Sequence, residues 1–151
     1  MDDRSLQEVW FPDGLCFGCG PANEGGLHLR SFARNGMVVA DWESVEVYRS
    51  GIPVVAGGVV GTLLDCHTGA AVLNAVGIRD GHTPYVDGDP WVTKSYTVNF
   101  RRATPLNRKL HVVAEISALD GVTARVVGSI TVDGETTATA TAEWRRLQPR
   151  T

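Results

Sequence analysis

One uninterrupted segment, from Ala56 to Gly77, constrains the fold more than any other part of the sequence. It begins with a glycine pair, contains no proline, and ends at Gly77, the residue type that most often follows a helix. At 100° per residue its larger apolar side chains share one broad face, which predicts a helix at about residues 57–76. That face comprises Val59, Val60, Leu63, Leu64, Cys66, Ala70, Ala71 and Leu73.

The opposite face of this predicted helix carries small side chains and a single carboxylate, Asp65. The small residues are Gly58, Gly61, Thr62, Thr68 and Gly69. Small side chains let another backbone or a ligand come close, and a glycine pair at a helix start leaves the first amide N–H groups open to a ligand. The pattern therefore points to a site at Asp65 and at the beginning of the helix.

Alternating apolar and polar residues predict strands before and after the helix. Residues 27–33 and 37–45 flank a turn at Arg34-Asn35-Gly36, which is typical of a hairpin. Four further runs follow Pro90, with turns at Asp120-Gly121 and Asp133-Gly134, and a meander is the simplest arrangement. In the first of these runs we expect one side to carry Val92, Lys94, Tyr96 and Val98.

We expect an α+β fold, with one long central helix wrapped by a five- or six-stranded antiparallel sheet. A single domain of residues 27–146 would follow an irregular N-terminal lid segment, 1–26, and precede a frayed tail, 147–151. The polar segment 78–90, rich in Gly, Asp and Pro, is expected to be a loop that borders a ligand entrance together with residues 10–26.

Charge and composition exclude several classes of protein. A net charge of -3 and a pI near 5.7 argue against a nucleic-acid binder. The acidic N-terminus does not resemble a signal peptide, and no apolar run approaches the roughly 18–20 residues that span a bilayer. Three cysteines, an odd number, indicate reduced thiols and a cytoplasmic protein.

Cys16 and Cys19 form a CxxC pair, which would bind zinc only with two further ligands. Cys66 and His67 are candidates by type, but adjacent helical residues point about 100° apart and make poor joint ligands. We therefore expect a glycine-rich packing loop or lid and no metal. No dinucleotide-binding, nucleophile-elbow or P-loop motif is present, so no cofactor is expected.

Three stretches carry a resemblance to a known family. Residues Cys16–Arg30 read CFGCGPANEGGLHLR, Ala56–Asp65 read AGGVVGTLLD, and Val92–Leu106 read VTKSYTVNFRRATPL. They resemble the signature C-F-G-C-G-x-x-N-x-x-G-L, the motif H-G-G-x-x-x-x-x-x-D/E and the strand ending N-F/Y-x-R-P of hotdog-fold acyl-CoA thioesterases of the PaaI-like branch. The resemblance implies the hotdog fold and hydrolysis of an acyl-CoA or related thioester.

The resemblance also implies roles for individual residues. Asp65 falls where the family places its general base or nucleophile, and Gly57 where a backbone N–H polarises the thioester carbonyl. Thr93 falls where some members hold the attacking water with Ser or Thr, although a plain strand threonine is equally consistent with its position. Further substrate contacts are expected from Gly58, Thr62, Ser50, Ala56 and His67.

Two departures from the family pattern leave an alternative open. Ala56 stands where the family usually has histidine, and Ser50 stands near the place of an Asn or Gln. The alternative is a non-catalytic hotdog protein that binds an acyl thioester. A hotdog hydratase or dehydratase is a third hypothesis, but Asp65 and His67 lie roughly 200° apart around the helix and cannot form a dyad. His67 is interpreted as a core or interface histidine, or as a substitute for the missing histidine from a partner helix.

The spacing of the two principal residues predicts a homo-oligomer. Gly57 and Asp65 are eight residues apart, roughly 12 Å along a helix, so one reacting carbon cannot touch both in one chain. Two helices packed antiparallel about a two-fold axis would bring Gly57 of one chain to Asp65 of the other, in a dimer or a dimer of dimers. The cluster Arg101, Arg102, Arg108 and Lys109 either meets a CoA phosphate or is a solvated surface.

Overall fold

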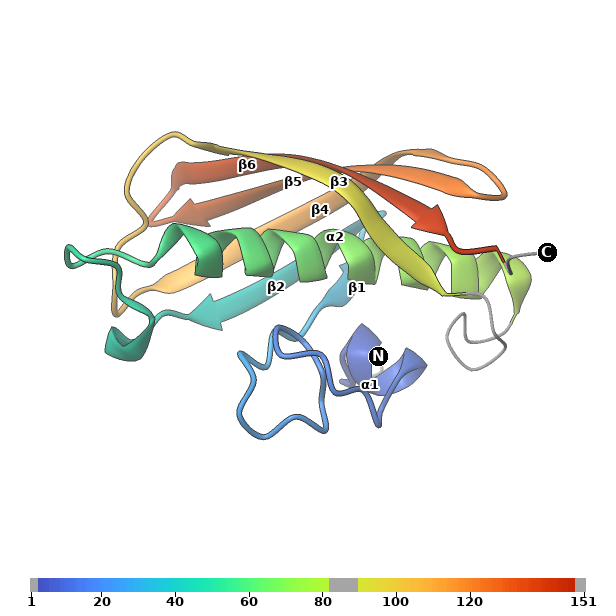
Figure 1. The fold of residues 1–151 in the computed structure, drawn as a ribbon, viewed down its shortest axis with the longest axis horizontal. Coiled ribbons are helices and arrows are strands. Elements are labelled where there is room, and N and C mark those ends of the chain that lie inside the picture. Colours follow the sequence, from blue (N-terminus) through green and yellow to red (C-terminus); the bar gives the residue numbers. More distant parts are fainter. Residues whose placement is uncertain (1–2, 82–89, 149–151) are drawn as a thin grey trace.

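The computed structural model describes residues 3–81 and 90–148 and shows one long helix packed against one face of an antiparallel sheet (Figure 1). The six strands confirm the predicted five- or six-stranded sheet and the α+β class. The elements are α1 (Leu6–Trp10), β1 (Phe32–Arg34), β2 (Met37–Glu43), a 3-10 turn (Glu46–Tyr48), α2 (Gly57–Asp80), β3 (Trp91–Phe100), β4 (Lys109–Leu119), β5 (Thr123–Val132) and β6 (Glu135–Arg146).

The strands lie in the order β1-β2-β4-β5-β6-β3, and every neighbouring pair is antiparallel. The meander predicted after Pro90 is therefore correct for β4, β5 and β6 but wrong for β3, which pairs with β6 at an edge of the sheet. The reason is the connection through α2. It carries the chain from β2 across the sheet, so that β4 returns to pair with β2.

Two predicted turns have the geometry that tight hairpins require. Asn35-Gly36 and Asp133-Gly134 have positive φ at both residues and join directly paired strand ends. The turn at Asp120 is wider, because Leu119 pairs with Ala124 and leaves four residues between them. There the Asp120 carboxylate accepts hydrogen bonds from two backbone amides of the loop at 2.8 Å.

Strand β3 contains a bulge that sequence alternation did not reveal. The register with β6 shifts between Thr93 and Ser95. Thr93, before the shift, bonds Asp65 on α2, and Tyr96, after the shift, lies beside Gly61 on α2. Lys94 instead bonds Glu143 on the outer side of the sheet. The prediction that Lys94 shares a side with Tyr96 and Val98 is therefore wrong.

Helix α2 extends further than predicted. It runs through Gly77 to Asp80 and ends at Gly81, whose φ of 73° is the left-handed conformation that suits glycine. Gly77 is instead a packing position. A Cβ atom there would lie 2.9 Å from the ring of Trp10, so only glycine lets the N-terminal segment sit this close to the helix.

The length and apolar composition of α2 alone would allow it to cross a membrane, contrary to the expectation that no run is long enough. Its apolar side chains, however, are mostly buried against the sheet. Val60, Leu63 and Leu64 join one half of the core, and Val72 and Val76 join the other. The helix is therefore the core element of the domain rather than a membrane span.

The N-terminal segment, expected to be irregular, contains the short helix α1. Ser5 and Glu8 form a capping box at its start, and Trp10 Nε1 donates to Asn74 on α2 at 3.0 Å. Most of the polar loop 78–90 and the end of the tail lie outside the described residues. The division into segment 1–26, domain 27–146 and tail 147–151 stays a prediction.

Candidate active site beside the central helix

Asp65 lines an apolar cavity of about 390 Å³ between α2, β6 and the N-terminal segment. Phe11 and Leu15 contribute from the N-terminal segment, Leu73 from α2 and Trp144 from β6. Residues 10–26 therefore do border a cavity that contacts the helix. The matching expectation for residues 78–90 falls largely outside the described residues.

The Asp65 carboxylate is hydrogen-bonded to a threonine on the edge strand β3. Thr93 Oγ1 donates a hydrogen bond of 2.6 Å to Asp65 Oδ1. Burial raises the pKa of Asp65 above its usual value, the Thr93 hydrogen bond opposes that rise, and the charge of Cys16 adds to it. Thr93 therefore contacts the carboxylate directly, and its part in a site stays a prediction.

The beginning of α2 faces a separate cavity of about 430 Å³, lined by Gly57, Ser50, Phe100, Arg101 and Arg102. Gly57 and Gly58 are exposed, and within residues 3–81 and 90–148 neither amide N–H has a hydrogen-bond partner. Ala56 occupies the N-cap position and offers no side-chain cap. The helix start therefore presents free donors with positive dipole character. Asp65 does not line this cavity.

Two other predicted contact residues use their hydroxyls locally. Ser50 Oγ donates to the carbonyl oxygen of Ile52 at 2.9 Å, which closes the turn before the helix. Thr62 Oγ1 donates to the carbonyl oxygen of Gly58 at 2.8 Å within α2. These bonds stabilise the backbone around the helix start, and Ser50 alone of the two lines one of these cavities.

His67 is a fully buried core residue. Its Nε2 donates to the carbonyl oxygen of Val38 at 2.9 Å, and its Nδ1 therefore accepts from Ser31 Oγ at 2.9 Å. Ser31 in turn accepts a hydrogen bond from Gln7. Burial lowers the pKa of His67 to about 4. The imidazole is neutral and faces away from Asp65, and it lines neither cavity, which agrees with the core interpretation.

The glycines on the small-residue face of α2 mostly accommodate aromatic rings of the same chain. A Cβ at Gly69 would lie 2.6 Å from Trp144, and a Cβ at Gly61 would lie 3.5 Å from the Tyr96 hydroxyl. Gly58 alone of the three has open space beside it. The expectation that Gly61 and Gly69 leave room for a partner helix is therefore corrected, since β3 and β6 fill that room.

All three cysteines meet at the edge of the Asp65 cavity, so Cys66, named from the sequence only as a candidate by type, does lie beside Cys16 and Cys19. Their Sγ atoms lie within 4.8 Å of one another. Hydrogen bonds with Cys19 and Cys66 lower the pKa of Cys16 to about 2. The contact with Cys16 raises the pKa of Cys19 to about 12 although the contact with Cys66 opposes that rise, and the contacts with Cys16 and Cys19 raise the pKa of Cys66. Cys16 is therefore the thiol that ionises first.

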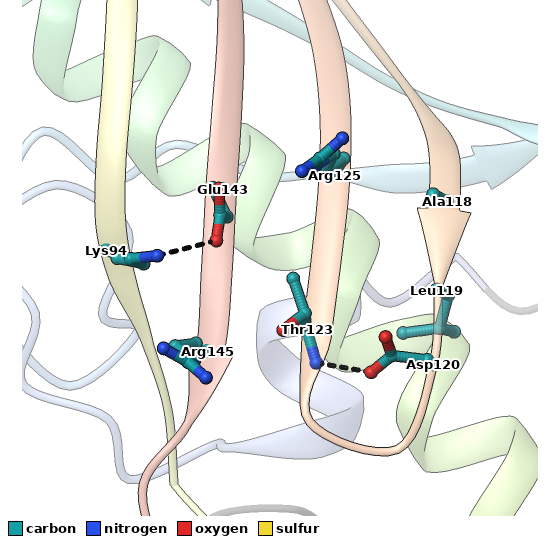
Figure 2. A pocket seen from close by; sticks show the side chains of 8 residues that line it. All are labelled: Lys94, Ala118, Leu119, Asp120, Thr123, Arg125, Glu143 and Arg145. Carbon is teal, nitrogen blue, oxygen red and sulfur yellow. Dashed lines mark hydrogen bonds and ion pairs between the residues drawn. The ribbon is translucent and has the colours of Figure 1, made fainter.

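A further cavity, of about 440 Å³, lies on the outer face of the sheet and holds none of the predicted site residues (Figure 2). Figure 2 shows side chains of β3, β5 and β6 with α2 behind the strands. Lys94 bonds Glu143 at 3.0 Å across this cavity. Its lining is largely polar and charged, unlike the apolar wall around Asp65, so we place the candidate site on the helix side.

Comparison with known proteins identifies the fold. No protein-family model matches the chain, and no curated protein matches its sequence. Among solved structures, a phenylacetic acid degradation-related protein of Ralstonia eutropha, described as a candidate thioesterase, has a TM-score of 0.70 at 22% identity and covers 94% of this chain and 99% of its own.

Two other structures give the same result. The PaaI protein of the E. coli phenylacetic acid degradation operon has a TM-score of 0.66 at 17% identity, covering 81% of each chain. A hypothetical thioesterase of Streptococcus pneumoniae, solved with coenzyme A, has a TM-score of 0.65 at 22% identity, covering 82% of this chain and 91% of its own. This chain therefore has the hotdog fold of the PaaI-like thioesterases.

Proposed function

We propose that this protein belongs to the PaaI-like thioesterases and hydrolyses an acyl-CoA or related thioester, with Asp65 as general base or nucleophile. The observation that carries the proposal is the half-buried Asp65 carboxylate, oriented by Thr93 in an apolar cavity beside α2. A carboxylate with a raised pKa is a stronger base than an exposed one. The apolar wall suits an acyl chain.

The reaction would require two groups with different tasks. Thr93 occupies Asp65 Oδ1, so Oδ2 is available to take a proton from water or to attack the thioester carbon directly. Negative charge then develops on the carbonyl oxygen, and the unpaired Gly57 N–H at the helix start would stabilise it. The C–S bond breaks, and the CoA thiolate leaves and takes up a proton. Where Asp65 attacks directly, water then hydrolyses the mixed anhydride, which releases the carboxylic acid and restores the Asp65 carboxylate.

A homo-oligomer would bring these groups together. Gly57 and Asp65 line separate cavities of one chain, so a site that uses both needs a second copy. Strand β3 ends the sheet on one side and carries the exposed aromatic residues Tyr96 and Phe100. Pairing of two β3 edges about a two-fold axis would place the helices antiparallel and cover these residues.

Two observations favour a CoA thioester as the substrate class. Arg101 and Arg102 line the cavity at the helix start, where guanidinium groups can bind phosphate. The Streptococcus pneumoniae protein with the same fold was solved with coenzyme A. No cofactor is required by this mechanism.

Thiol release from a panel of acyl-CoA thioesters tests the proposal. Asp65→Asn keeps the size of the side chain but removes its basicity, and we expect kcat to fall about 10²- to 10⁴-fold with the fold retained. Asp41→Asn, an exposed aspartate on β2, is the matched control and should keep full turnover. Full activity in Asp65→Asn would contradict the assignment. Binding of acyl-CoA without any hydrolysis would support the non-catalytic alternative that Ala56 suggests.

A further inference from the structure

Three cysteine side chains from two distant segments converge beside α2, and they are all the cysteines in the chain. Cys16 Sγ and Cys66 Sγ are 3.7 Å apart, and all three Sγ atoms lie within 4.8 Å of one another. A tetrahedral zinc ion with Zn–S bonds of about 2.3 Å holds its sulfur ligands about 3.8 Å apart. The spacing of these sulfurs therefore suits a shared metal ion.

The loop that carries Cys16 and Cys19 makes a tight, hydrogen-bonded turn beside the three sulfurs. Gly20 N donates to the carbonyl oxygen of Cys16 at 2.8 Å, which closes the turn that carries both cysteines.

Two glycines make this close winding possible. A Cβ at Gly18 would lie 2.4 Å from Cys66 Sγ, and a Cβ at Gly20 would lie 2.4 Å from Cys16 N. Both positions therefore need glycine for the loop to place its cysteines on α2. Packing of the loop on α2 does not by itself require that all three sulfurs lie together where Gly18 meets Cys66.

We propose that Cys16, Cys19 and Cys66 bind a thiophilic divalent metal ion, with zinc as the best match. Each bound thiol loses its proton to solvent, so that three thiolates hold the ion. No fourth His, Cys, Asp or Glu ligand joins the cluster within the part of the chain that the structure describes. All three cysteines line the cavity that contains Asp65, so the fourth position opens on that cavity and takes a water molecule.

The ion would fasten the N-terminal segment to α2. A disulfide between Cys16 and Cys66 is the competing chemistry, but it uses two sulfurs and leaves Cys19 as a buried thiol. The metal site accounts for all three sulfurs. The proposal is independent of thioester hydrolysis and can hold or fail without it.

Metal analysis of the full-length protein, purified under reducing conditions and dialysed after addition of zinc, tests the proposal directly. We expect about one zinc per chain and release of protons on binding. Removal of zinc by a chelator should lower Tm, because the ion binds only the folded chain. Cobalt(II) in its place should give the near-ultraviolet charge-transfer absorption of a thiolate-bound ion.

Variants identify the ligands. Cys16→Ser, at an exposed position, should lose the bound metal and the cobalt signal while the fold, checked by circular dichroism, is retained. Phe17→Ala, in the same loop, and His28→Asn, an exposed histidine, are matched controls that should keep the metal. The proposal is overturned if wild type binds no zinc, or if Cys16→Ser binds as much as wild type. It is equally overturned if thiol titration shows two of the three cysteines joined in a disulfide when zinc is present.

Discussion

The hydrogen bond from Thr93 to Asp65 is the most informative contact at the scale of single residues. It joins a strand residue and a helix residue 28 positions apart, and it is short, at 2.6 Å. Thr93 stands just before the bulge in β3, and its hydroxyl faces the helix. Beyond the bulge the alternation of the strand changes phase, so simple alternation along β3 does not predict which residues face the helix. This contact makes Asp65 an oriented group rather than an exposed helix aspartate.

Thr93→Val should separate orientation from packing. Valine keeps the shape but removes the donor, so the pKa of Asp65 should rise further, because the hydrogen bond that lowers it is gone. A base must be deprotonated to act, so the acid limb of the kcat/KM profile should move to higher pH, with turnover about tenfold lower. Thr97→Val, on an exposed position of the same strand, is the control. An unmoved acid limb in Thr93→Val would show that Thr93 does not orient the base.

His67 predicts a pH dependence of stability. Its pKa is about 4 in the folded chain and about 6.5 when unfolded, so the unfolded state binds more protons between these values. The free energy of unfolding should therefore fall as the pH is lowered from about 6.5 to about 4, by about 3 kcal/mol from this residue.

Urea unfolding of wild type and His67→Gln across this range measures the effect. Glutamine retains one donor and one acceptor but cannot take up the proton, so its stability should be lower at neutral pH and should depend less on pH. Equal slopes in the two proteins would show that His67 does not cause the loss.

At the scale of elements, the glycines of α2 show how helix and sheet fit together. Gly69 lies under the ring of Trp144 and Gly77 under that of Trp10. Each glycine lets a large ring approach the helix backbone, and the rings come from β6 and from α1. Gly69, which belongs to the small-residue face of the predicted helix, and Gly77, the predicted helix end, are therefore both packing contacts within the chain.

Gly69→Ala should destabilise the protein by about 1–3 kcal/mol, because the added methyl group collides with the buried Trp144 ring. Gly58→Ala on the same helix meets no atom within 4 Å and should leave stability unchanged or raise it by up to about 1 kcal/mol. Thermal unfolding of both variants gives the comparison. A Gly69→Ala variant as stable as Gly58→Ala would contradict this account of the packing.

Features set by neighbouring residues could be predicted from the sequence, whereas features set by contacts distant in sequence could not. The existence of α2 and the hairpin turns at Asn35-Gly36 and Asp133-Gly134 depend on neighbouring residues, and the sequence predicted them. The true end of α2, the place of β3 beside β6 and the bulge at Lys94 depend on contacts distant in sequence.

The candidate site follows the same rule. Asp65 and Gly57 were predicted from motif and spacing, since both lie in one helix, and their roles stay predictions. The meeting of Cys66 with Cys16 and Cys19 could not be predicted from helix geometry alone, because it depends on the path of the N-terminal loop. The one local signal was the CFGCG sequence, whose glycines allow the loop to contact the helix.

At the scale of the whole molecule, a site built from Gly57 and Asp65 requires more than one chain. Gly57 and Asp65 line different cavities, and β3 leaves one edge of the sheet unpaired in the described chain. We expect sedimentation at micromolar concentration to show a dimer or a dimer of dimers. A stable monomer would contradict the shared site, whatever the activity of the protein.

Mixing two inactive variants tests the shared site most directly. Gly57→Pro removes the amide donor but suits the first position of a helix, since Ala56 already has the extended conformation that precedes proline. Asp65→Asn removes the base. Each homodimer should be inactive on the thioester that wild type hydrolyses.

Refolding the two variants together at equal amounts should give mixed dimers in about half of the population, each with one intact site of two. We expect recovery of about a quarter of wild-type turnover. Mixed dimers that form, as native mass spectrometry would show, yet recover no activity would contradict a site built from Gly57 of one chain and Asp65 of the other.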